Sequence, residues 1–227
     1  MRVSTGIEVF DEMLEGGFEA DTITTIYGPA GSGKTNICLS CMARTAREGS
    51  KVIYFDTEGG YSVERLKQIA PDYEKILKNV FFFRPTSFAE QKANFERFKQ
   101  LMDESTTKKI RLIIVDTISM LYRVELGQSD DIYTVNSELG KQISYLSEIA
   151  RKKSIPVLIT NQVYTDPETN SIKMVGGDLL KYWSKCLIEV ERFKTYRRAV
   201  LRKHRSIPEN KEVYFEIKHD GIKKVEE

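Results

Sequence analysis

The chain has 227 residues, of which 41% are hydrophobic and 30% are charged, and its formal net charge is +2. This length suits one generous domain, and the hydrophobic share excludes a disordered or low-complexity chain. No apolar run approaches the roughly 18–20 residues of a membrane-spanning helix. The N-terminus has no apolar signal core, and three cysteines are too few for a disulfide framework. We therefore expect a cytoplasmic protein with no membrane partner.

Apolar segments alternate with helical segments along the first two thirds of the chain. Strands are expected where β-branched, aromatic and aliphatic residues cluster between turns, over residues 22–27, 51–56, 80–83, 110–116 and 155–160. Helices are expected over residues 35–47, 62–70, 88–103 and 135–152. Apolar strands that alternate with helices predict an α/β fold, with a mostly parallel central sheet flanked by helices.

The last third of the chain changes pattern. From Cys186 onward three strand-like segments, over residues 186–193, 197–205 and 212–222, follow one another without an intervening helix. The sequence therefore predicts a C-terminal antiparallel extension of the central sheet. We expect residues 1–227 to form a single domain.

A glycine-rich loop lies between the first expected strand and the first expected helix. It matches GxxxxGK[ST], a pattern whose glycines let backbone N–H groups converge on phosphate oxygens. Its residues are Gly28, Pro29, Ala30, Gly31, Ser32, Gly33, Lys34 and Thr35. The Lys34 ammonium is expected to reach the β- and γ-phosphates of ATP, and the Thr35 hydroxyl to bind Mg²⁺.

Polar side chains follow several of the other expected strands. Asp116 ends an apolar strand at the carboxyl edge of the sheet, where it is expected to hold Mg²⁺ through water. Glu58 is a candidate to activate the water that attacks the γ-phosphate, and Asp56 competes with it at the same strand end. Asn161 and Gln162 follow the fifth expected strand, where an amide could sense the γ-phosphate or simply bond within a turn.

Taken in chain order, these motifs resemble the RecA/RadA recombinase family, and within it the short archaeal paralogues of RadA. The matching stretches are STG near the N-terminus, the phosphate loop, FDTEGGYSVERL, LIIVDTIS, ITNQV, MVGG and EVYFEIKHDGI, and they cover essentially the whole chain. The resemblance implies a RecA-like P-loop ATPase core that uses ATP and Mg²⁺.

The resemblance also implies roles for individual residues. Glu58 would activate the water, Arg65 would stack on adenine, and Gln162 would link the γ-phosphate to the second DNA-binding loop. The first DNA-binding loop would fall within residues 122–134 and the second within about residues 163–177.

The chain also departs from the recombinase pattern. Full recombinases carry an N-terminal helical DNA-binding domain and a polymerising linker, and here the ATPase core starts within a few residues of Met1, so both are expected to be absent. The first loop has three acids, Glu125, Asp130 and Asp131, where the recombinases have arginine, and the second contains one lysine, Lys173. Because these acids repel phosphate, filament-type DNA binding should be weak, and strand exchange is not expected.

Residues 192–205 hold seven basic residues and no acid. This stretch could contact the DNA backbone without sequence preference, or it could be two ordinary solvated strand faces. The DNA-binding candidates are Arg192, Lys194, Arg197, Arg198 and Arg202, together with Lys173. Lys203 and Arg205 are candidates to act in trans on a neighbouring subunit's ATP, since alternate residues of a strand share one face.

Three functions remain open from the sequence. The first is a DNA-binding, ATP-binding and weakly ATP-hydrolysing accessory protein of homologous recombination and DNA repair, a DNA-linked ATPase. The resemblance then implies a RadA-type recombinase and a Holliday-junction nuclease as partners. The second is a nucleotide-gated interaction switch with negligible turnover. The third is a KaiC-like signalling ATPase with no DNA role, assembled as a ring, and homo-oligomers are possible in each case.

Overall fold

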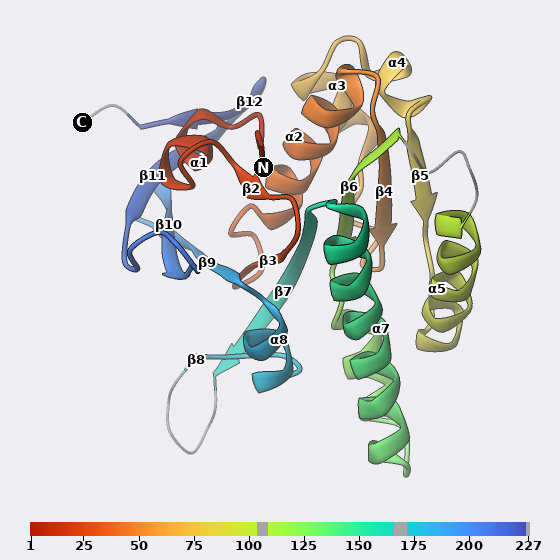
Figure 1. Ribbon diagram of the computed structural model, residues 1–227. Coiled ribbons are helices and arrows are strands. Elements are labelled where there is room, and N and C mark those ends of the chain that lie inside the picture. The colour runs from red at the N-terminus through yellow and green to blue at the C-terminus, as the bar shows by residue number, and fades with distance from the viewer. Residues whose placement is uncertain (104–108, 166–171, 226–227) are drawn as a thin grey trace.

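A computed structural model describes residues 1–103, 109–165 and 172–225. Within these residues, one large sheet has the strand order β12-β11-β10-β9-β3-β7-β6-β4-β5, with β8 paired to β7, and β1 and β2 form a separate small sheet. In Figure 1 the C-terminal strands β9–β12 lie with α1 on one side of the molecule, and β5 with α5 lies on the other. The predicted fold class is confirmed.

The parallel half of the large sheet comprises β9, β3, β7, β6, β4 and β5. The strands of the first two thirds of the chain are β1 (Arg2–Val3), β2 (Phe18–Glu19), β3 (Ile23–Gly28), β4 (Lys51–Asp56), β5 (Val80–Phe83), β6 (Ile110–Asp116) and β7 (Val157–Thr165). Because parallel strands end at the same edge, the residues that follow β3, β4, β6 and β7 are brought together.

The antiparallel half continues from β9, which joins it to the parallel half. Its members are β9 (Cys186–Phe193), β10 (Tyr196–Lys203), β11 (Glu212–Lys218) and β12 (Gly221–Lys224), and β8 (Ile172–Met174) forms a hairpin with β7. β9 runs parallel to β3, from Thr24 opposite Cys186 to Tyr27 opposite Glu189. The far end of β9 therefore reaches the loop that follows β3.

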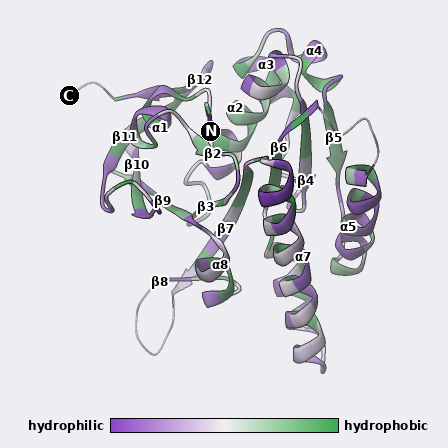
Figure 2. Ribbon diagram, in the orientation of Figure 1, coloured by the Kyte–Doolittle hydropathy of each residue, from purple (hydrophilic) through white to green (hydrophobic). Residues whose placement is uncertain are grey.

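Helices cover both faces of the sheet, and the side chains of the strands alternate between them. On β4, Val52 and Tyr54 join the core beneath α1–α4, whereas Ile53 and Phe55 join the core beneath α5–α8. The helices are α1 (Glu8–Met13), α2 (Lys34–Arg47), α3 (Val63–Ile69), α4 (Tyr73–Leu77), α5 (Phe88–Asp103), α6 (Met120–Leu126), α7 (Ile132–Lys153) and α8 (Asp178–Trp183). Figure 2 shows hydrophobic residues concentrated on the strands, with hydrophilic residues along α5 and α7.

The structure differs from the sequence prediction in several places. The single strand predicted over residues 212–222 is divided into β11 and β12. The predicted first DNA-binding loop, residues 122–134, is helical at both ends, because α6 continues to Leu126 and α7 begins at Ile132. β7 continues to Thr165, beyond the predicted end at residue 160. β10 ends at Lys203, so Lys203 and Arg205 do not alternate along one strand as expected.

No helix in the described parts of the chain is long and apolar enough to cross a membrane.

Candidate nucleotide-binding site

The phosphate loop lies where β3 ends and α2 begins. Gly31 and Gly33 have φ angles of 71° and 107°, in the left-handed region that glycine adopts without strain. Packing adds a second constraint at Gly33, because a Cβ there would lie 2.8 Å from the Cδ1 atom of Ile217 on β11. Residues 28–35 therefore turn tightly into the N-terminus of α2, an arrangement that binds phosphate groups.

Lys34 lies across this loop and is buried. Its Nζ atom donates hydrogen bonds to the carbonyl oxygens of Gly28 and Pro29, each at 2.9 Å. Burial lowers the pKa of Lys34, while the nearby charges of Glu58 and Asp116 oppose that shift. The ammonium is thus held by weak neutral acceptors, which phosphate oxygens can replace with stronger charge-assisted bonds.

Asp116 ends β6 and is almost fully buried. Burial raises the pKa of its carboxyl group, against hydrogen bonds from Thr160, Thr35 and Tyr54, and the Tyr54 hydroxyl donates at 3.1 Å. The nearby charge of Asp56 adds to the rise. A divalent cation beside Asp116 would favour its charged form, because an opposite charge counteracts the penalty of burial.

Glu58 and Gln162 are in direct contact. The Gln162 amide donates a 2.8 Å hydrogen bond to Oε1 of Glu58, and the Thr117 hydroxyl donates to the same oxygen at 3.1 Å. This contact joins the end of β4 to β7 across the end of β6. The residues predicted to activate water and to sense the γ-phosphate therefore form one hydrogen-bonded pair.

Asp56, the competitor of Glu58, has a different setting. It is buried, accepts a 2.9 Å hydrogen bond from the Gly60 amide and forms a 3.6 Å ion pair with Arg84. Glu58 is exposed and lines a cavity together with Lys34 and Asp116. The geometry therefore favours Glu58 as the group that faces a ligand, with Asp56 holding the glycine turn behind it.

One cavity of about 420 Å³ unites most of the predicted site residues. It is lined by Ala30, Gly31, Gly33, Lys34, Thr35, Asn36, Glu58, Asp116, Gln162, Arg197 and Ile217. Sequence reasoning missed Asn36 and Ile217, and it placed Arg197 on a DNA-binding surface. Asn36 is one residue beyond the motif. Ile217 and Arg197 are brought to the cavity by the pairing of β9, β10 and β11, and the sequence around each residue carries no signal of that pairing.

The donor set fits a nucleotide with Mg²⁺. The Ser32 hydroxyl is buried and has no hydrogen-bond partner among the described residues, so the loop holds an unmet polar group. Nowhere in the described chain do three His, Cys, Asp or Glu side chains cluster to hold a metal. Thr35 and Asp116 supply only oxygen donors, which suits Mg²⁺ because this ion usually keeps several waters and binds substrate phosphates.

Arg65, the residue expected beside adenine, is fixed on α3 by four hydrogen bonds. Its Nε donates to Asn36 at 2.7 Å, and Nη1 donates to the Gln68 side chain and the His219 carbonyl, both at 2.8 Å. Its Nη2 donates to the Lys218 carbonyl at 2.8 Å. The guanidinium plane therefore has a set orientation beside the turn between β11 and β12.

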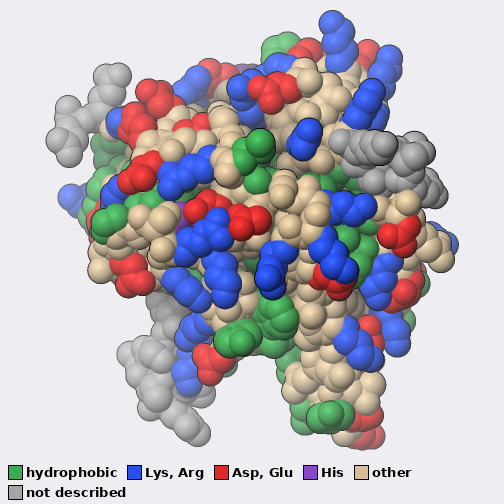
Figure 3. All heavy atoms as spheres, viewed as in Figure 1, with side chains coloured by type: hydrophobic (Ala, Val, Ile, Leu, Met, Phe, Trp, Pro, Cys, Tyr) green, Lys and Arg blue, Asp and Glu red, His purple; other side chains and the backbone are tan. Residues whose placement is uncertain are grey.

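The basic stretch over residues 192–205 is neutralised in part by acids of its own chain. Arg198 pairs with Glu191 and, at 3.3 Å, with Glu212, and Arg202 pairs with Glu189 at 2.6 Å. These acids lie on the neighbouring strands β9 and β11, outside the stretch itself. In the view of Figure 3, both Lys or Arg and Asp or Glu side chains are present on the surface.

The two candidates for action in trans lie at the far end of β10. Arg205 pairs with Glu19 at 2.7 Å and with Asp21 at 2.6 Å, within its own chain. Lys203 donates a 2.7 Å hydrogen bond to the Lys181 carbonyl. The expectation that both point from one strand face is wrong, because β10 ends before Arg205 and a register shift interrupts it between Leu201 and Lys203.

The remaining DNA-binding candidates are dispersed. Arg192 donates a 3.4 Å hydrogen bond to the Gly31 carbonyl of the phosphate loop. Lys194 has a positive φ of 53° at the β9–β10 turn, and its Nζ lies 5.6 Å from the centre of the Phe193 ring. Lys173 lies exposed on β8. Residues 166–171 of the predicted second DNA-binding loop lie outside the described residues.

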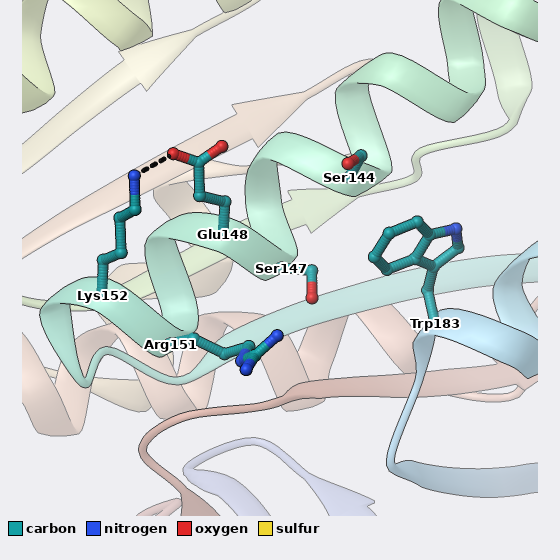
Figure 4. A pocket seen from close by; sticks show the side chains of 6 residues that line it. All are labelled: Ser144, Ser147, Glu148, Arg151, Lys152 and Trp183. Carbon is teal, nitrogen blue, oxygen red and sulfur yellow. Dashed lines mark hydrogen bonds and ion pairs between the residues drawn. The ribbon is translucent and has the colours of Figure 1, made fainter.

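A second cavity, of about 550 Å³, lies between α7 and α8 (Figure 4). It is lined by Ser144, Ser147, Glu148, Arg151, Lys152 and Trp183, and Lys152 pairs with Glu148 at 2.6 Å. All but Trp183 come from α7. The phosphate loop and the polar ends of β4, β6 and β7 line the first cavity, which is therefore the stronger candidate for nucleotide chemistry.

The fold and this site together define a P-loop ATPase of the RecA type. A family model described as Rad51 matches residues 1–225. A protein named "DNA repair and recombination protein RadB" from Methanobrevibacter smithii is 43% identical over 218 residues, covering 93% of this chain and 92% of the relative. One with the same name from Methanococcoides burtonii is 43% identical over 215 residues, covering 94% and 93%.

A solved structure agrees with the sequence matches. The "Crystal structure of the RadB recombinase" superposes with a TM-score of 0.81 at 37% identity, and the match covers 98% of this chain and 99% of that one. The chain therefore belongs to the Rad51 family and falls within its RadB group. The resemblance inferred from the sequence motifs is confirmed, and members of this family are P-loop ATPases that bind ATP with Mg²⁺.

Proposed function

We propose that this chain binds ATP with Mg²⁺ and DNA, hydrolyses ATP slowly, and assists homologous recombination and DNA repair without exchanging strands itself. The names of the RadB relatives support the recombination role. The observation that carries the nucleotide role is the 2.8 Å hydrogen bond between Gln162 and Glu58, in a cavity shared with Lys34 and Asp116. The residues proposed to bind phosphate, to hold Mg²⁺ and to activate water line one cavity, which supports this role.

The residues of the cavity have different roles in the binding and hydrolysis of ATP. The Lys34 ammonium leaves the loop carbonyls and binds the β- and γ-phosphate oxygens. Thr35 and Asp116 hold Mg²⁺, which when bound neutralises charge on those phosphates. Glu58 accepts a proton from the water that attacks the γ-phosphate, and Gln162 and Thr117 hold its carboxylate in position for that step.

The Gln162–Glu58 contact also supports a second function, a nucleotide-gated switch. Gln162 lies on β7, which continues to Thr165 and pairs with β8 across the predicted second DNA-binding loop. A γ-phosphate that competes for the Gln162 amide would change this contact in the ATP state alone. Such a difference between states is what a ligand needs to shift a partner-binding surface.

DNA is proposed as a partner without sequence preference and with modest affinity. The ion pairs of Arg198 and Arg202 reduce the charge that the C-terminal strands offer to phosphates. Partnerships with a RadA-type recombinase and a Holliday-junction nuclease, and assembly of several copies, remain proposals that rest on the family.

The test is ATP turnover measured without DNA, with single strands and with duplex, at two salt concentrations. We expect slow turnover that DNA changes, and DNA binding that weakens steeply as salt rises. Turnover that is identical in all conditions, without DNA binding at low salt, would contradict the DNA role. If Lys34→Ala abolishes binding to a recombinase while Glu58→Gln preserves it, the switch is favoured over hydrolysis.

A further inference from the structure

Two arginines of the basic stretch face each other at the turn end of the β9–β10 hairpin. Arg192 on β9 and Arg197 on β10 are directly opposed in the register of the two strands. Like charges at directly opposed positions destabilise a sheet. Neither has an acidic partner in the parts of the chain that the structure describes, whereas Arg198, the next residue on β10, pairs with Glu191 and Glu212.

Arg197 also carries an unmet hydrogen-bond donor. Its Nε atom is buried without a partner among the described residues, and its Nη1 donates a 3.4 Å bond to the adjacent Tyr196 carbonyl. Burying a cationic donor without a partner is unfavourable, and such groups are normally paired in folded proteins. Two opposed guanidinium groups without a carboxylate partner in the described residues favour the binding of an anion between them.

The Arg192 side chain contacts the phosphate loop of its own chain, and the Arg197 side chain lines the cavity beside that loop. Because β9 runs parallel to β3, its end lies beside the loop that follows β3. The Arg192 Nε is 3.4 Å from the Gly31 carbonyl, and a Cβ on Gly31 would lie 2.4 Å from Arg192 Nη2. Arg197 lines the same cavity as Lys34, Glu58 and Gln162.

We infer that Arg192 and Arg197 bind the phosphate chain of the nucleotide held by their own subunit, and that they are not part of a DNA-binding surface. The inference rests on the proposed binding of ATP. A polyphosphate between the guanidinium groups relieves their mutual repulsion and satisfies the buried Nε of Arg197. The planar fork of arginine offers paired N–H donors to phosphate oxygens.

The positions of the two arginines predict different selectivity. Arg197 lines the same cavity as Glu58 and Gln162, the residues proposed to meet the γ-phosphate, so we expect it to distinguish ATP from ADP. Arg192 lies beside Gly31 in the middle of the loop and is not among the residues that line the cavity, so we expect it to bind phosphates that both nucleotides possess.

The experiment measures the affinity for a non-hydrolysable ATP analogue and for ADP, each with Mg²⁺, by titration calorimetry. A charge-assisted hydrogen bond corresponds to roughly a tenfold change in affinity or more. Arg197→Ala should therefore weaken the ATP analogue about tenfold or more and ADP much less. Arg192→Ala should weaken both nucleotides. The matched control is Arg198→Ala, on the same strand but already ion-paired, which should leave both affinities near wild type.

Thermal unfolding distinguishes a loss of nucleotide binding from a defect in folding. Without nucleotide, Arg192→Ala and Arg197→Ala should keep or raise the midpoint, because each removes a repulsion between like charges. The rise in midpoint that ATP produces should shrink in Arg197→Ala, as it does for any loss of ligand affinity. Arg197→Lys, which keeps the charge and loses the fork, should be intermediate.

Nucleotide affinities that stay at wild-type values in both variants, with DNA binding reduced instead, would overturn the inference and assign these arginines to DNA. That result leaves the proposed ATP binding intact. A wild-type protein that binds neither nucleotide contradicts the proposed function itself and removes the basis of the inference.

Discussion

The two ends of the β9–β10 hairpin carry the same residue type in opposite electrostatic settings. At the far end, Arg205 forms ion pairs with Glu19 and Asp21. At the turn end, Arg192 and Arg197 oppose each other beside the phosphate loop, with no carboxylate partner in the described chain. Arg205 therefore links segments of the fold, whereas Arg192 and Arg197 are proposed to bind a ligand.

The difference shows that the role of a basic residue depends more on the acids that lie near it in the fold than on its neighbours in sequence. Residues 192–205 contain no acid, yet Arg198 and Arg202 are paired because Glu191, Glu189 and other acids lie on adjoining strands. A one-residue shift in strand register would exchange the paired and unpaired arginines. We expect the turn end of the hairpin to be functional and the far end to be structural.

The largest effect is expected at Glu58, in the cavity beside the turn end. Glu58→Gln should lower ATP turnover by about 10²–10⁴-fold, the usual contribution of a general base, while ATP affinity is retained. Steady-state phosphate release and nucleotide titration measure the two quantities. Asp56→Asn is the matched control, since Asp56 binds Gly60 and Arg84, and a loss of turnover as large as that of Glu58→Gln would contradict the assignment.

Lys203 tests whether the far end has a function in a neighbouring subunit. If Lys203 acts in trans, Lys203→Ala should lower turnover by about 10²-fold, as the loss of one transition-state donor does, with ATP affinity unchanged. The effect should appear only at concentrations where the chains assemble, which light scattering can follow. Equal losses of turnover and affinity would exclude the role in trans and leave the far end purely structural.

Arg205→Ala should lower the free energy of unfolding by about 1 kcal/mol, because it removes two partly exposed ion pairs. Urea unfolding measures the change, and ATP affinity should not move. Arg205 lowers the pKa of Asp21, so this stabilisation is present above the ordinary carboxyl pKa and is lost as pH falls through the folded-state value. Wild type and variant should therefore converge in stability in acid, and a constant difference would contradict the ion-pair account.

The smallest effect is expected from His204, next to Arg205. Burial lowers the pKa of His204, Glu19 opposes that shift, and the ring Nδ1 accepts hydrogen bonds from Ser206 and Ile207 amides at 3.2 and 3.1 Å. The imidazole of His204 therefore binds a proton more readily in the unfolded chain than in the folded one. The free energy of unfolding should fall as pH drops through the ordinary histidine pKa of about 6.5.

His204→Gln should flatten that dependence of the unfolding midpoint on pH. His219→Gln is the matched control, because His219 is the chain's other histidine and its side chain is exposed. A slope that persists in His204→Gln would place the titrating group elsewhere.

Local sequence signals were sufficient for the phosphate end of the sheet. The glycine pattern over residues 28–35 marks a strand, a loop and a helix that follow one another in the chain. The acid that ends LIIVD marks the end of a strand in the same local way. The structure accordingly gathers Lys34, Thr35, Asp116, Glu58 and Gln162 as the sequence predicted, while their roles stay predictions.

Contacts set by long-range register could not be predicted. The placement of Arg197 over the cavity requires β9 to pair with β3, two segments about 160 residues apart in sequence. The helix α6 was missed because it is only seven residues long and most of it falls within residues 122–134, where the family resemblance implies a DNA-binding loop. Arg205 was misplaced because nothing local signals where β10 ends.

The hydrogen bonds of Arg65 have a consequence for the dynamics of the edge of the sheet. They tie α2 and α3 to the carbonyls of Lys218 and His219, which begin the turn into the edge strand β12. A base stacked on this guanidinium would immobilise the turn through those bonds. Amide hydrogens of β11 and β12 should then exchange with solvent more slowly in the nucleotide complex. Their exchange rates would therefore measure binding in a cavity whose lining comes mostly from the first half of the chain.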